Sequence, residues 1–177
     1  MGRRWDTLVE VCERRIGDHT RPFNDVHFAM PLALGGRTDS AQALLASMQS
    51  FAAAAPDSVS VAPVLREAGI PVCAAILAYA AGDYGRAVDL LMPARDQLQG
   101  LGGSWAQRDV FVLLLIESAL RDGRINTARG LLAERLLMRP NNAKAWRTYA
   151  RALDMSGAVE AAEAARAKAS AVRVQAG

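Results

Sequence analysis

Apolar side chains recur along this chain every three or four residues, the spacing that places them on one face of a helix. The first such stretch runs from Trp5 to Ile16 and predicts a single helix over residues 5–16. Alternation of apolar and polar residues, the pattern of a half-buried strand, is limited to the short segment 58–61. The pattern therefore predicts an all-α protein.

A glycine, a branched aliphatic residue two positions later and an alanine five positions later recur at an interval of 34 residues. The two clearest copies are Gly123 with Ile125 and Ala128, and Gly157 with Val159 and Ala162. A period of 34 residues is that of the tetratricopeptide helix–turn–helix unit. Glycine allows the left-handed backbone that ends the first helix, and alanine allows the second helix to pack closely. Looser copies at Gly36 and Gly82 extend the prediction to a tetratricopeptide-type solenoid of about four helix pairs, preceded by the single helix.

The predicted helix pairs are not evenly spaced along the chain. They are expected at residues 22–54, 70–99, 104–140 and 142–173. Gly36 and Gly82 are 46 residues apart, and Gly82 and Gly123 are 41 apart, so two insertions interrupt the 34-residue interval. The insertions fall near residues 55–69 and 100–103, and we expect the first to be a loop that carries one helical turn.

Polar residues at the expected helix starts predict several caps. Asn24 is expected to cap the first helix of the first pair, and Asn142 the first helix of the last pair. Ser104 and Gln107 have the spacing of a capping box. Pro31 lies inside a predicted helix and is expected to kink it.

Composition narrows the class of protein without identifying a function. The 177 residues are 51% apolar, which suits a single helical-repeat domain over residues 1–177. The net charge is +3 and the arginines are scattered among carboxylates, so no nucleic-acid partner is predicted. No run of 18 apolar residues occurs and no apolar segment follows Arg3 and Arg4, so we expect neither a membrane span nor an export signal.

Cysteine and histidine are too few and too scattered to predict a metal site. Cys12 and Cys73 are the two cysteines, and they have no metal-binding spacing and cannot form a disulfide framework. His19 lies in a predicted loop eight residues before His27 and does not form a ligand pair with it. We therefore expect no metal, no cofactor and a cytoplasmic location.

Two polar segments at expected helix starts form the first candidate site. They contain Asn24, Asp25 and His27 in one segment and Gln107, Arg108 and Asp109 in the other. A histidine near a carboxylate is the minimum for general acid–base chemistry, but no serine or cysteine nucleophile motif lies beside these residues. Helix capping and inter-repeat bonding explain the same residues, so we predict no catalytic residue and leave a ligand contact open.

A basic stripe on the last helix pair forms the second candidate site. Lys144, Arg147 and Arg151 are spaced so that they share one face of a helix. In tetratricopeptide repeats this is the concave face, and the stripe is similar to the clamp that holds an acidic peptide or a carboxylate. A solvated charged face is the alternative, because the equivalent positions of the preceding pair are mostly apolar and include Glu117.

Segment 110–116 is apolar at every position, which predicts a helix that is buried on every side. A four-pair solenoid would leave Val110 and Leu113 on its open concave surface, together with Val72 and Ile76 of the preceding pair. We therefore expect a cover: the first insertion, a missing N-terminal segment, or a second copy of the chain in a homodimer.

Several strings of the chain go beyond the general repeat pattern. They are residues 22–27 (PFNDVH), 70–73 (IPVC), 82–88 (GDYGRAV), 102–109 (GGSWAQRD) and 133–135 (AER). With these strings the chain resembles the C-terminal part of the tetratricopeptide repeat protein 38 family. Members of that family are longer at the N-terminus, and relatives tend to have a histidine at the position of Trp105. The resemblance implies a helical-repeat fold. It implies no activity, because none is well established for the family.

Two classes of function follow from these observations. The first is a non-catalytic helical-repeat scaffold for protein–protein interaction or assembly, with a protein or acidic peptide as partner. The alternative is a small-ligand or hydrolytic site around His27, Arg108 and Asp109, completed by a missing N-terminal region.

Overall fold

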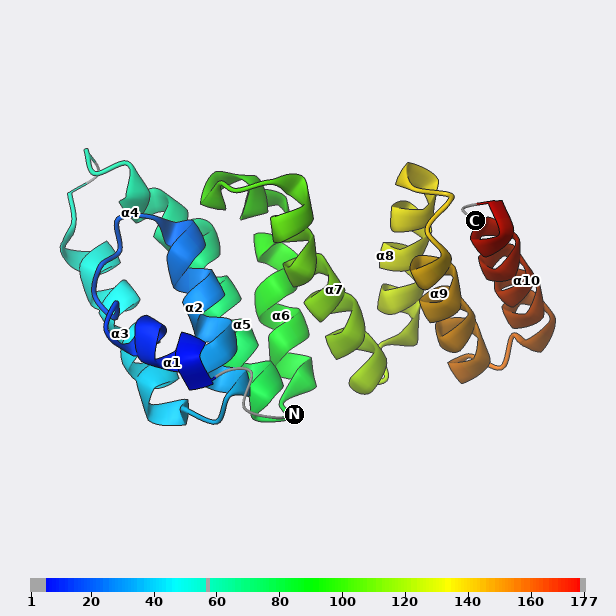
Figure 1. Cartoon of the computed structure of the whole chain (residues 1–177), viewed down its shortest axis with the longest axis horizontal. Helices are drawn as coiled ribbons and strands as arrows, with labels where there is room; N and C mark the ends of the chain where they lie inside the picture. The colour runs from blue at the N-terminus through cyan, green and yellow to red at the C-terminus, as the bar shows by residue number, and fades with distance from the viewer. Residues whose placement is uncertain (1–5, 57, 176–177) are drawn as a thin grey trace. The chain divides into compact units, whose positions relative to one another are not determined.

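The computed structural model describes residues 6–56 and 58–175, and all regular elements within these ranges are helices (Figure 1). The α-helices are α1 Asp6–Glu13, α2 Pro22–Leu34, α3 Thr38–Ala54, α4 Val61–Val64, α5 Ile70–Ala80, α6 Tyr84–Ala94, α7 Trp105–Arg121, α8 Ile125–Met138, α9 Ala143–Met155 and α10 Val159–Gln175. A π-helix, η2 Leu65–Gly69, joins α4 to α5, and a 3-10 helix, η3 Arg95–Leu101, follows α6. The prediction of an all-α protein is confirmed.

The chain divides into two compact units, Met1–Leu115 and Ile116–Gly177, and the division falls inside α7. In the first unit α5 packs against α2, α3 and α6. In the second unit α9 packs against both α8 and α10. Trp5, the first residue of the helix predicted over residues 5–16, lies outside the described residues; the described helix α1 ends at Glu13.

The repeated glycines end helices as the sequence predicts. Gly36, Gly82, Gly123 and Gly157 have φ angles of +80°, +82°, +78° and +76°. An added Cβ at any of these four positions would meet no atom within 4 Å, so the backbone conformation alone requires glycine there. The alanines five positions after them are fully buried, which fits their predicted role at close helix contacts.

The helix caps agree with the sequence at two of three positions. The Ser104 amide donates to Gln107 Oε1 at 2.8 Å and the Gln107 amide to Ser104 Oγ at 3.3 Å, which is a capping box. Asn142 Oδ1 accepts from the Ala145 amide at 2.9 Å. The prediction for Asn24 is wrong, because α2 already begins at Pro22, where the missing amide and fixed φ favour the first helical position. α2 then continues through Pro31 to Leu34.

The first insertion is more helical than predicted. Its second half, α4 and η2, runs directly into α5 and forms one continuous helix from Val61 to Ala80. A π-helical segment within an α-helix accommodates an extra residue without ending the helix. By length and apolar composition this helix alone, among the described residues, could cross a membrane, but half of its apolar stretch is buried inside the first unit. In the second insertion η3 ends at Leu101 and is followed by Gly102 and Gly103, both with positive φ.

The first unit itself supplies a cover for two of the apolar residues that the sequence analysis expected to be covered. Val72 and Ile76 are almost completely buried by other residues of the chain, so they need no external cover. On α1, Val9 is also buried, whereas Leu8 and Val11 are exposed. Val110 and Leu113 are half-buried.

The second unit has a smaller core built mainly from alanine. Ala150 and Leu153 of α9 pack against Ala162 and Ala165 of α10. Trp146 borders this cluster, and Lys168 Nζ lies 4.6 Å from the centre of its ring, within range of a cation–π interaction. The small side chains let the two helices approach closely.

Candidate functional site

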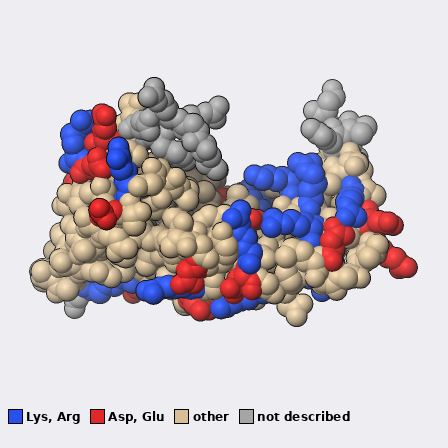
Figure 2. All heavy atoms as spheres, turned by 90° about the horizontal axis from the view of Figure 1, so that it is seen from below, with Lys and Arg blue, Asp and Glu red and all other residues tan. Residues whose placement is uncertain are grey.

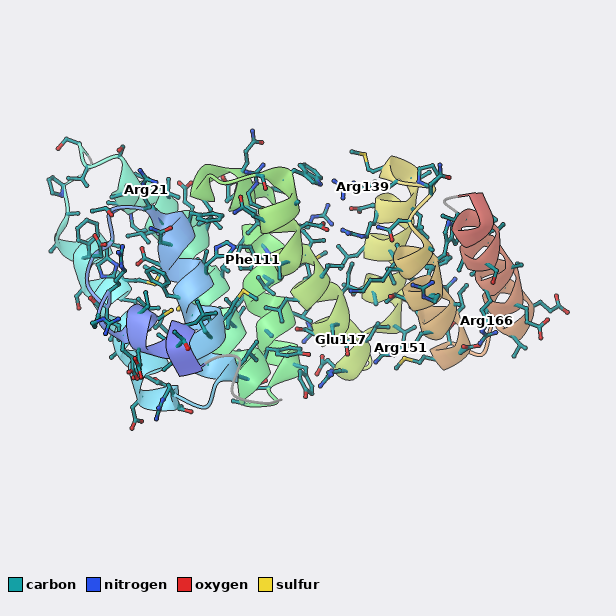
Figure 3. The ribbon with its side chains drawn as sticks, viewed as in Figure 1. Arg21, Phe111, Glu117, Arg139, Arg151 and Arg166 are labelled. Atoms are coloured by element: carbon teal, nitrogen blue, oxygen red, sulfur yellow. The ribbon has the colours of Figure 1, made fainter. Side chains whose placement is uncertain are left out.

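The basic stripe lies on α9 in the second unit, but its three cations differ in their surroundings. Lys144 and Arg147 are exposed, and neither side chain has a hydrogen bond or ion pair within the described ranges. Arg151 is already engaged, because its Nη1 donates to Glu117 Oε2 at 2.8 Å (Figure 3). The sequence suggested a stripe of three available cations, but only Lys144 and Arg147 are free to bind a ligand.

Glu117 of α7 connects two arginines. Its Oε1 accepts from Arg121 Nε at 2.7 Å, while Oε2 accepts from Arg151. Burial by itself raises the pKa of Glu117, but the hydrogen bonds and charges of the two arginines outweigh burial and hold the pKa below its ordinary value of 4.5. Glu117 therefore remains a carboxylate at neutral pH and fixes Arg151 on the face that carries the stripe.

Positive charge is concentrated in the second unit. Its sequence holds 11 Lys and Arg residues against 6 Asp and Glu, a net charge of +5, whereas the first unit has 10 against 12, a net charge of −2. Figure 2 shows lysine and arginine side chains gathered over the region of α8 and α9. In the same unit the Nε atom of Arg129 on α8 is buried and has no hydrogen-bond partner among the described residues.

The polar segment of α2 is arranged differently from the predicted cluster. His27 Nδ1 lies 2.7 Å from the Phe23 carbonyl oxygen, so Nδ1 donates to it and the neutral ring leaves Nε2 as its acceptor. The ring stacks on Phe23 at 4.0 Å and meets Phe111 edge-on at 5.4 Å between ring centres. The α7 side chain in ring contact with His27 is thus the aromatic Phe111. Asn24 is half-buried on α2.

The polar segment of α7 serves the turn that precedes the helix. Arg108 Nη1 donates to the Gly102 carbonyl at 3.0 Å and also to the Gly103 carbonyl. Gln107 closes the capping box, and Asp109 is half-buried in the first turn of α7. These contacts favour the structural interpretation of Gln107 and Arg108, since both side chains satisfy backbone groups.

Asp25 does not pair with His27 but with the other histidine. Its Oδ1 lies 3.2 Å from His19 Nδ1, and both side chains are almost completely buried. On the other side of the ring, His19 Nε2 lies 2.8 Å from Ser47 Oγ. The three side chains come from the segment before α2, from α2 and from α3. Sequence reasoning missed this arrangement because Ser47 is 28 residues from His19 and no motif surrounds it.

The buried carboxyl of Asp25 is only partly compensated. Its second oxygen, Oδ2, is buried without a hydrogen-bond partner in the described part of the chain. Burial raises the pKa of Asp25, and His19 opposes that rise. Burial, with a smaller effect from the charge of Asp25, raises the pKa of the Cys73 thiol to about 12. His19 is therefore the principal group that stabilises the Asp25 charge.

Metal-binding residues are not clustered in the part of the chain that the structure describes. No group of three or more His, Cys, Asp or Glu side chains there could hold a metal ion. Cys12 and Cys73 are both free and buried.

Comparison with known proteins adds no family or structural relative to this geometry. No family model matches the chain, and no solved structure gives a significant match.

Proposed function

We propose that the chain is a tetratricopeptide-type helical-repeat scaffold, similar to the C-terminal part of the tetratricopeptide repeat protein 38 family. The proposal rests on helix pairs whose first helix ends at a glycine with positive φ, with Gly123 and Gly157 separated by the repeat length of 34 residues. In such arrays each pair packs on its neighbours, and the first helices of the pairs present a surface to partners.

The second unit of this scaffold binds an acidic peptide. The observation that carries this proposal is the pair of exposed cations on α9, Lys144 and Arg147, which have no partner within the described ranges. Arg151 is held beside them by Glu117. Because the unit has a net charge of +5, an acidic ligand is attracted before contact, and Arg147 can form a paired hydrogen bond with one carboxylate. This role is one of binding, with no chemical step on α9.

A fluorescent hexaglutamate peptide tests the proposal by anisotropy titration at low salt. Replacing Arg147 with Ala is expected to raise the Kd at least about tenfold, which is more than the loss of a single exposed ion pair would cause. Added salt is expected to weaken binding of the parent. Arg14→Ala is the matched control, since it removes one exposed arginine from the first unit and leaves α9 intact. Equal losses of affinity in the two variants would show that only the net charge of the protein matters. Absence of binding at low salt would refute the proposal.

A further inference from the structure

Ser47, His19 and Asp25 form a hydrogen-bonded series in the first unit, remote from α9 in sequence. His19 Nε2 faces Ser47 Oγ at 2.8 Å, and His19 Nδ1 faces Asp25 Oδ1 at 3.2 Å. The ionised carboxylate of Asp25 has no proton to donate, so Nδ1 of His19 carries the proton of this hydrogen bond. Nε2 is then the acceptor for the Ser47 hydroxyl. A hydroxyl bonded to a histidine that a carboxylate orients is the arrangement that activates a serine nucleophile.

The histidine is held in place by its surroundings. It has a φ of +42° although it is not a glycine, a conformation that costs energy and persists only where other contacts enforce it. Its ring is buried and lies 5.4 Å from the ring of Phe51, measured between centres. The orientation needed for proton transfer from Ser47 is therefore set before any ligand binds.

Asp25 is suited to stabilise a positive charge on His19. Its Oδ2 is buried without a hydrogen-bond partner in the described chain, so the carboxylate relies mainly on His19 for compensation. When His19 accepts a proton, the imidazolium pairs with this carboxylate in surroundings of low polarity, where the attraction is strong. Proton transfer to His19 is thereby favoured.

Ser47 is the member of the series that a ligand can reach. Its side chain is half-buried, whereas His19 and Asp25 are almost fully buried. Gly17 lies opposite it with φ +100°, and a Cβ there would stand 3.7 Å from Ser47 Oγ. Because Gly17 has no side chain, the space beside the hydroxyl remains open, but it is small.

We propose that Ser47 is the nucleophile of an acyl-transfer site for small uncharged esters, with His19 as general base and Asp25 as the residue that orients it. The Phe51 ring beside His19 and the missing side chain at Gly17 favour a short apolar acyl group. This site goes beyond peptide binding on α9 and depends on none of its residues.

The reaction balances without a further reactant except water. Ser47 Oγ attacks the ester carbonyl and its proton passes to His19 Nε2. The tetrahedral intermediate expels the alcohol, which leaves with that proton, and the acyl group remains on Ser47. Water then attacks this acyl ester while His19 takes its proton, and collapse releases the carboxylic acid and returns the proton to Ser47.

A fluorophosphonate probe and p-nitrophenyl acetate test the proposal on the full chain. We expect one phosphonyl adduct per chain, mapped to Ser47 by peptide mass spectrometry, and hydrolysis that falls at least about tenfold in Ser47→Ala. Ser50→Ala is the matched control, because Ser50 is an exposed serine one turn further along α3. It is expected to keep both labelling and hydrolysis, and comparison with it removes the background from other reactive side chains of the chain, such as His27.

A cysteine substitution keeps the test decisive if Ser47→Ala loses stability. Ser47→Cys keeps the hydrogen-bonding position, and its thiol next to His19 is expected to react with iodoacetamide at pH 7 faster than that of Ser50→Cys, although Ser50 is more exposed. Labelling that maps elsewhere, an unlabelled folded protein, or a slower thiol at position 47 would overturn the proposal and leave the series as a structural link between α2 and α3.

Discussion

Arg151 Nη1 donates to Glu117 Oε2 across 2.8 Å, and the two residues are 34 positions apart. The same interval separates the turn glycines Gly123 and Gly157. The ion pair therefore joins equivalent positions of α7 and α9, and it fixes one of the three cations that the sequence places on the stripe.

Removal of this ion pair is expected to lower the free energy of unfolding slightly at neutral pH and to leave it unchanged in acid. Glu117→Gln should lower the free energy of unfolding by up to about 1 kcal/mol, because the arginines are well exposed. The pKa of Glu117 is lower in the folded chain than its ordinary value of 4.5, so its contribution is present above that pH and is lost as the pH falls through the folded pKa.

Urea unfolding of the parent and Glu117→Gln at pH 7 and pH 3 measures this difference. Glu163→Gln removes an exposed carboxylate of α10 in the same unit and controls for the change in net charge. A difference between Glu117→Gln and the parent that persists unchanged at pH 3 would show that the pair acts through packing rather than charge.

Substitutions at the repeated glycine and alanine are expected to destabilise the second unit. Gly123→Val forces a branched residue into φ +78°, and Ala128→Leu overpacks a fully buried position; each should cost about 1–3 kcal/mol. Gly130→Ala is the control, since Gly130 lies within α8 with no atom within 4 Å of an added Cβ, and it should gain about 0.5–1 kcal/mol. Thermal melting within error of the parent for both destabilising variants would contradict the repeat assignment.

The two adjacent glycines before α7 are expected to differ in tolerance. Both have positive φ, but an added Cβ at Gly102 meets no atom within 4 Å, whereas one at Gly103 would overlap the ring of Phe23. Gly103→Ala should therefore be less stable than Gly102→Ala, and it should shift the NMR signals of His27, whose ring stacks on Phe23. Equal melting temperatures and unchanged His27 signals would show that Phe23 moves aside without cost.

Both cysteines are expected to be unreactive until the chain unfolds. Burial raises the pKa of Cys12 and raises that of Cys73 to about 12, so Cys73 has almost no thiolate at pH 8 and Cys12 has less than an exposed thiol. A disulfide reagent monitored by absorbance should react slowly with the folded protein. In guanidinium chloride, where the chain is unfolded, it should react rapidly with both thiols. The extra thiol of Ser50→Cys, on an exposed position of α3, should react at once; a native thiol that reacts as fast would show local opening.

Local sequence determined the helices, their turns and two of their caps. Gly123 and Gly157 could be assigned from spacing alone, because a left-handed turn depends on the residue that occupies it rather than on distant contacts. Ser104 and Gln107 were predictable for the same reason: a capping box joins groups three residues apart.

Tertiary structure decided the extent of the inserted helix and the partners of the polar side chains. The interrupted repeat interval predicted a loop with one helical turn at residues 55–69, but residues 61–69 are helical. Ala62, Leu65 and Ala68 are buried in the first unit, and this packing stabilises the helix. Asp25 pairs with His19 rather than His27, and Ser47 joins them from 28 residues away. Spacing within a helix predicts which residues share a face, but hydrogen bonds between separate segments depend on how those segments pack, and no local pattern encodes that.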